Sequence, residues 1–193
     1  MAKKESTFKN MVFVLFIVSF ISSAALGVVY ELTKEPIRMV DINKKNNAIQ
    51  SVVPEFNNAP ANESFKVPSD LDSLTFYPAK KDSILIGTAV ETYTKKGFSG
   101  LIRLMIGFAP DGSILHIAVL EHKETPGLGD KIDKSKSNFS LQFEGKNPAS
   151  FKMAVKKDRG DVDAITASTI SSRAYCDAVT RAYNSYMQTK KTN

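Results

Sequence analysis

Four hydroxyl side chains occupy six consecutive positions near the C-terminus and are the residues best suited to chemistry. They are Thr166, Ser168, Thr169 and Ser171. Residues 161–165 alternate in polarity as a short strand does, and a helical pattern follows the hydroxyl cluster. A strand-to-helix junction of this kind offers hydroxyls and unpaired backbone N–H groups together. Such a junction is a suitable seat for a phosphate group.

Spacing alone leaves three interpretations of this cluster open. Serine and threonine collect at helix N-termini because they cap backbone N–H groups, so Ser168 or Thr169 could simply be an N-cap. The cluster could also bind an anion without a covalent bond, or one threonine could accept a phosphoryl-linked cofactor. The sequence contains neither a G-x-S-x-G elbow nor a P-loop, so serine-hydrolase and P-loop chemistry are not expected.

The remaining reactive residue types are too few for a catalytic or metal site. The single cysteine, Cys176, excludes an internal disulfide, and its amphipathic helical setting predicts a small buried hydrophobic residue. The two histidines, His116 and His122, have no further ligands nearby, so no metal site is expected. The net charge of +6 is spread over short lysine pairs without interleaved aromatic residues, which argues against nucleic-acid binding.

The N-terminal region predicts a membrane anchor. Residues 10–30 contain no charged side chain, and about 21 helical residues span roughly 32 Å, enough to cross a bilayer core. A cleaved signal peptide is the alternative, because residues 22–25 are small. The apolar run continues past these small residues to Val29, which favours an uncleaved helix. Lysines before the span predict a cytoplasmic N-terminus and place the bulk of the chain outside.

After the span, residues 31–53 continue a helical pattern that Pro36 could kink, and we interpret them as a stalk. A loop-like segment leads to residue 72. The predicted organisation is therefore a cytoplasmic N-terminus (1–9), a transmembrane helix (10–30), a helical stalk and linker (31–72) and an extracytoplasmic domain (73–193).

The domain is expected to be α+β, with an antiparallel sheet and a C-terminal helix. Strands are predicted at 84–94, 101–108 and 114–121, with a hairpin turn at Asp111-Gly112. Alternation in the third strand places Ile114 on the same face as Ala118 and Leu120, opposite Ile117 and Val119. Helices are predicted at 137–143 and 170–188.

A glycine-rich loop follows the third strand. Gly127 and Gly129, preceded by Pro126, allow the backbone to approach a flat ligand closely. Glu121 and Glu124 flank this loop, and as isolated residues they could be ordinary surface acids.

Four segments together resemble a known family. They are residues 97–103, 119–132, 155–158 and 161–172. They are similar to the G subunit of the Rnf ion-translocating electron transport complex, whose FMN-binding domain is shared with the C subunit of the Na⁺-pumping NADH:quinone reductase. The resemblance covers roughly residues 84–186 and extends to the N-terminal anchor. The long run at 121–132 favours the Rnf family over its relative.

The resemblance implies a covalent FMN. In the family, FMN is joined through its phosphate to the last threonine of an Asp-x-x-[Ser/Thr]-Gly-Ala-Thr motif. The matching positions here are Asp163, Thr166, Ala167, Ser168 and Thr169. Thr169 is thus the expected acceptor. Ala167 and Ser168 stand where the family usually has glycine and alanine, and Ser168 offers an alternative hydroxyl.

The resemblance also implies the rest of the site. Thr166, Ser168, Thr169 and Ile170 would surround the phosphate attachment. The isoalloxazine ring would lie against the loop residues Glu124, Thr125, Gly127, Leu128 and Gly129. A separate flavin transferase would install FMN from FAD.

The implied function is electron transport. The chain would be a single-pass inner-membrane flavoprotein with a periplasmic domain, working with the other proteins of an Rnf-type translocase that couples ferredoxin/NAD electron transfer to Na⁺ or H⁺ movement. Three alternatives stay open: an FMN-domain membrane regulator or sensor, a carrier like the C subunit of NADH:quinone reductase, and an anchored module without cofactor.

Overall fold

The computed structural model describes residues 7–69 and 72–192, and it divides into two compact units. One unit ends at Asn43 and the other begins at Lys44. The predicted cytoplasmic N-terminus at 1–9 lies mostly outside the described residues.

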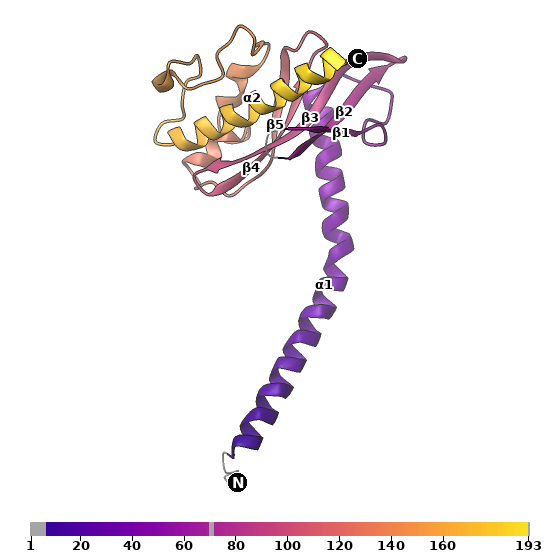
Figure 1. Cartoon of the computed structure of the whole chain (residues 1–193), viewed down its shortest axis with the longest axis vertical. Coiled ribbons are helices and arrows are strands. Elements are labelled where there is room, and N and C mark those ends of the chain that lie inside the picture. Colours follow the sequence, from indigo (N-terminus) through magenta and orange to yellow (C-terminus); the bar gives the residue numbers. More distant parts are fainter. Residues whose placement is uncertain (1–6, 70–71, 193) are drawn as a thin grey trace. The chain divides into compact units, whose positions relative to one another are not determined.

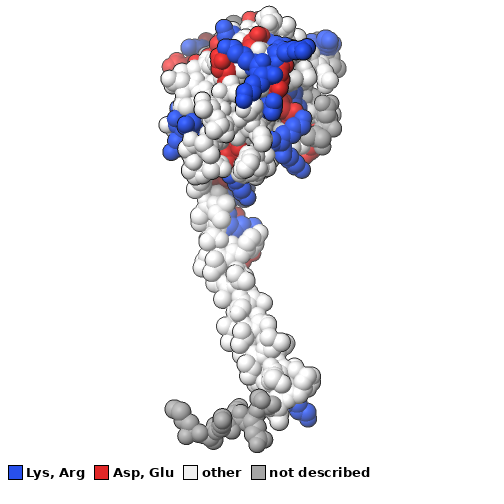
Figure 2. All heavy atoms as spheres, turned by 90° about the vertical axis from the view of Figure 1, so that its left-hand side faces the viewer, with Lys and Arg blue, Asp and Glu red and all other residues white. Residues whose placement is uncertain are grey.

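The first helix, α1, runs without interruption over Phe8–Val52, with Pro36 inside it. Within the described residues it is the one helix long and apolar enough to cross a membrane. Figure 2 shows its apolar part as an uncharged surface, whereas most charged side chains lie on the compact unit. The predicted span and stalk are therefore one continuous helix.

Five antiparallel strands form a single sheet in the order β1-β2-β3-β4-β5 (Figure 1). They are β1 (Phe65–Pro68), β2 (Ser73–Lys81), β3 (Ile84–Gly97), β4 (Gly100–Phe108) and β5 (Ile114–His122). The three strands predicted from the sequence correspond to β3, β4 and β5. The first two strands were not predicted, because β1 has only four residues and Pro78 interrupts the strand pattern of β2.

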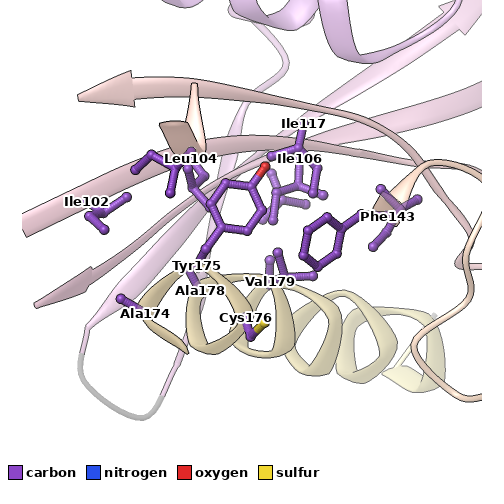
Figure 3. Packing of buried hydrophobic residues seen from close by; sticks show 14 of the residues in the cluster. Ile102, Leu104, Ile106, Ile117, Phe143, Ala174, Tyr175, Cys176, Ala178 and Val179 are labelled. Atoms are coloured by element: carbon purple, nitrogen blue, oxygen red, sulfur yellow. The ribbon is translucent and has the colours of Figure 1, made fainter. Parts of the chain in front are cut away.

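The C-terminal helix α2 (Thr169–Thr192) covers one face of this sheet (Figures 1 and 3). It is longer than the predicted helix at 170–188. Tyr175 and Val179 of α2 are buried against Leu104 and Ile106 of β4. Apolar burial of this kind is the main source of stability in such a layer.

The opposite face packs on the end of α1. Ala48, Ile49 and Val52 are buried in a cluster with Met105 of β4. A Cβ on Gly107 would lie 1.8 Å from the carbonyl oxygen of Val52, so glycine is required for this approach. The compact unit therefore begins at Lys44, earlier than the boundary at residue 73 that the sequence suggested.

Two local predictions were wrong. Ile114, Ile117 and Val119 share the cluster under α2, whereas Ala118 and Leu120 lie in the cluster on the other face. A register shift between β4 and β5 breaks the expected alternation, as a bulge does.

The predicted strand at 161–165 is also absent. Only an isolated parallel bridge between Val155 and Val162 forms there. Three short 3₁₀ helices lie between β5 and α2: Gly129–Ile132, Phe139–Phe143 and Lys156–Asp158. The second replaces the helix predicted at 137–143.

Candidate functional site

The turn that leads into α2 is held by Ser172. Its hydroxyl donates to the Ser168 carbonyl (3.0 Å) and accepts from the Ile165 amide (2.9 Å). The Ser172 amide donates to the same Ser168 carbonyl (3.1 Å), which makes Ser168 the N-cap position. The amides of residues 169–171 precede this bond, so they lie at the positive end of the helix.

Ala167 sits in the left-handed region, with φ of 61°. An L-residue adopts this conformation at a steric cost, whereas glycine does so freely. The turn geometry thus explains why glycine is usual at this motif position in the family that the sequence resembles.

A cavity of about 310 Å³ opens in front of this turn, within the size range of small-molecule sites. Ten residues line it: Phe98, Glu124, Thr125, Leu128, Gly129, Ala167, Ser168, Thr169, Ile170 and Ser171. The structure thus brings together two stretches far apart in sequence that were predicted to form one site.

Seven of the nine predicted site residues line the cavity, and two do not. Thr166 is exposed in the turn, and Gly127 is exposed in the loop with φ of 75°. The sequence did not single out Phe98, and it marked Ser171 only as a member of the hydroxyl cluster, not as a residue of the site. Phe98 lies in a turn between two glycines, a position that gives no sign of a partner 26 or more residues away.

The cavity has a polar inner wall made by Glu124. This residue is only 4% exposed, so it is not a surface acid. Its Oε1 accepts the Ser99 amide (2.9 Å), and its Oε2 accepts the Ser171 hydroxyl. Glu124 therefore connects the β3–β4 turn, its own loop and the first turn of α2.

The rim of the cavity is apolar. Phe98, Leu128 and Ile170 are 68%, 42% and 48% exposed, and together they form an apolar patch at one cavity. Because each comes from a different one of the three converging segments, the rim can contact a flat ligand from several sides.

The candidate acceptor hydroxyls differ in access. Ser168 is 7% exposed, whereas Thr169 is half-buried. Both line the cavity, but Thr169 is the more accessible of the two.

Two ion pairs lie near the turn. Arg173 of α2 makes a two-pronged contact with Asp158 (2.7 and 2.8 Å), and this hydrogen bonding lowers the pKa of the Asp158 carboxyl. Asp163 of the motif pairs with Lys156 at 2.7 Å and does not line the cavity.

Cys176 lies on the buried side of α2, as predicted. It is 3% exposed, and burial raises its pKa to about 12. A thiol in this setting is not nucleophilic at neutral pH.

The geometry thus suits a ligand with an anionic end and a flat apolar end. The anionic end matches the amides and hydroxyls at the start of α2, and the flat end matches the apolar rim.

Comparisons with known proteins agree with this description. Residues 97–184, which include every residue that lines the cavity, match the family model described as an FMN-binding domain. The chain is 38% identical over 162 residues to the G subunit of the ion-translocating oxidoreductase complex of Haemophilus influenzae strain PittEE, covering 80% of this chain and 78% of that protein.

Two further relatives carry the same name. The protein of Shewanella amazonensis is 36% identical over 173 residues, covering 84% of this chain and 80% of its own length. The protein of Vibrio cholerae serotype O1 strain M66-2 is 32% identical over 178 residues, covering 88% of this chain and 85% of its own length. The chain therefore belongs to the G-subunit family of the Rnf ion-translocating oxidoreductase complex, and it carries the FMN-binding domain of that family.

Proposed function

We propose that this protein is a membrane-anchored flavoprotein subunit that carries electrons within an Rnf-type ion-translocating complex, on FMN attached through its phosphate to Thr169. One observation carries the proposal: Thr169, at the start of α2, and the 124–129 loop line the same cavity. This juxtaposition matches the two ends of FMN.

The start of α2 would hold the phosphate. The amides of residues 169–171 precede the first intrahelical bond, and the dipole of the 24-residue helix favours negative charge there. The turn that Ser172 braces keeps these donors in place. Thr169 is favoured over Ser168 as acceptor because its side chain is more exposed to the flavin transferase.

The apolar rim would contact the ring. Phe98, Leu128 and Ile170 offer apolar surface, and Gly129 lines the same cavity. The bound flavin supplies reversible uptake and release of electrons, whereas the protein binds, orients and partly shields it.

Attachment would form one bond and break another. Thr169 Oγ would form a phosphoester with the FMN phosphorus of FAD, the pyrophosphate bond would break, and AMP and a proton would leave. A separate flavin transferase would catalyse this transfer. The covalent bond would keep the cofactor on a domain that faces the periplasm.

Partner proteins are required for translocation. A single membrane span offers no ion path of its own, so the other membrane proteins of the complex would supply it. Lys9, directly before the apolar run, favours a cytoplasmic N-terminus. The helix would then cross the inner membrane, and the unit that begins at Lys44 would lie on its extracytoplasmic side.

Intact-mass measurement tests the attachment. The full-length protein, produced with a flavin transferase, is expected to gain one FMN increment, which peptide mapping places on Thr169. The variant Thr169→Ala should lose the increment, and the matched control Ser168→Ala should keep it. An increment that persists in Thr169→Ala and disappears in Ser168→Ala would refute the assignment.

A further inference from the structure

The Glu124 carboxylate is a buried charge without a cationic partner. Among the described residues, no lysine, arginine or histidine side chain forms an ion pair with it. His122 accepts a hydrogen bond from the backbone amide of Glu124 (3.2 Å). A buried carboxylate of this kind needs a reason, because removing a charge from water is costly.

The hydrogen bonds at this carboxylate suit an acceptor on each oxygen. Both oxygens act as acceptors, one for the Ser99 amide and one for the Ser171 hydroxyl. An ionised carboxylate only accepts hydrogen bonds, and these two contacts match that role.

The surrounding backbone closes tightly around these oxygens. A Cβ on Gly97 would lie 2.8 Å from Oε1, and a Cβ on Gly129 would lie 2.7 Å from Oε2. Any larger residue at either position would displace the carboxylate. The segments are thus built to hold this charge at the cavity wall.

We propose that Glu124 sets the reduction potential of the flavin, and this inference rests on the function proposed above. A negative charge in a poorly solvated wall repels added electrons more strongly than the same charge in water does. The charge of Glu124 therefore makes the bound flavin harder to reduce and keeps the midpoint potential of the flavin low.

A purely structural role is the competing explanation. Glu124 joins three segments, and its loss could disturb the ring position without any electrostatic effect. The two roles differ in one respect: only an electrostatic role depends on the charge rather than on the hydrogen bonds.

Redox potentiometry of the full-length, FMN-loaded protein separates these roles. Glu124→Gln keeps the shape of the side chain and can still accept the Ser99 amide. In this variant we expect the one-electron equilibrium of the flavin to shift at least tenfold toward the reduced form. This shift corresponds to a rise of about 59 mV in the midpoint potential. Ser171→Ala removes a hydrogen bond but keeps the charge, so its potential should not rise.

Glu121→Gln is the matched control. Glu121 lies three residues earlier, pairs with Arg103 at 3.1 Å and does not line the cavity. Its removal should leave the potential close to that of the wild type. A rise in Ser171→Ala equal to that in Glu124→Gln would overturn the inference, as would an unchanged potential in Glu124→Gln.

Two further readouts keep the test decisive. Thermal unfolding of the flavin-free protein reports whether Glu124→Gln is folded. If it is not folded, Thr125→Lys takes its place, because it adds a positive charge at an exposed position of the same cavity. The midpoint potential must then rise, and an unchanged value overturns the inference.

The proposed function and this inference can fail separately. A wild-type protein that binds no FMN would refute the proposed function itself, whereas a loaded protein with a charge-independent potential refutes only this inference.

Discussion

Replacing Ala167 by glycine is expected to stabilise the compact unit. Ala167 has φ of 61°, and the left-handed conformation costs an L-residue roughly 1–2 kcal/mol. Glycine removes this cost, but it also raises the conformational entropy of the unfolded chain. That entropy cancels roughly 0.5–1 kcal/mol of the gain in stability. Because the Ala167 side chain is exposed, little packing is lost. The net gain in the free energy of unfolding should be about 0.5–1 kcal/mol.

Thermal unfolding of the flavin-free protein measures this effect. For a unit of this size, 1 kcal/mol corresponds to a change of about 2–4 °C in Tm, so a rise of about 2 °C is expected. Urea unfolding should give a higher midpoint with an unchanged m-value, because the surface exposed on unfolding is nearly the same.

Ala164→Gly is the matched control. Ala164 lies in the same segment but is not among the described residues with positive φ. Glycine at that position adds unfolded-state entropy and loses the contact of a partly buried methyl group with the core, so stability should fall by at least about 0.5–1 kcal/mol. A loss of stability in Ala167→Gly similar to that in Ala164→Gly would show that the backbone strain argument is wrong.

Two other predictions concern polar groups that are partly or fully removed from solvent. Burial raises the pKa of Glu91, but hydrogen bonding from Arg103 and the charge of Lys45 outweigh it, so the net pKa lies below its usual 4.5. The stability that Glu91 provides should be complete above about pH 4.5 and should fall as the pH drops through the lowered pKa. Urea unfolding between about pH 3 and pH 6 measures this effect. In Glu91→Gln the free energy of unfolding should fall less steeply at the acid end of that range. The Tyr175 hydroxyl is buried without a hydrogen-bond partner, so Tyr175→Phe should raise the free energy of unfolding by about 1 kcal/mol. Tyr186→Phe, which loses a hydroxyl that donates to a backbone carbonyl (3.1 Å), should lower it by a similar amount, and equal effects of the two variants would contradict this reasoning.

Local patterns in the sequence were sufficient to predict the anchor, the meander and the C-terminal helix. The three predicted strands correspond to β3, β4 and β5, because apolar alternation and the Asp111-Gly112 turn are local signals. The bulge in β5 and the burial of residues 48–52 depend on contacts with distant elements. No local pattern reports such contacts, so these features could not be predicted.

The candidate site shows the same division. The hydroxyl cluster and the glycine loop were predicted because their chemistry is local or because the resemblance included them. Phe98 was missed because it meets the site only through the shared cavity. Ser171 was recognised as part of the hydroxyl cluster, but its bond to Glu124 was not, because that partner lies in another segment. Glu124 itself could not be distinguished from a surface acid until its burial was known.

The strand register explains why the site lies at this end of the sheet. Gly97 pairs with Gly100 at the tip of the β3–β4 hairpin, and Ile102, just after the tip, pairs with His122 at the end of β5. In an antiparallel meander the loop after β5 must therefore leave the sheet beside that tip. Glu124 is the first buried residue of this loop, and it receives one hydrogen bond from the tip and one from the start of α2. Glu124 thus both joins the three segments and lines the cavity between them. Its effects on structure and on redox potential can therefore be separated only by changing its charge while keeping its shape.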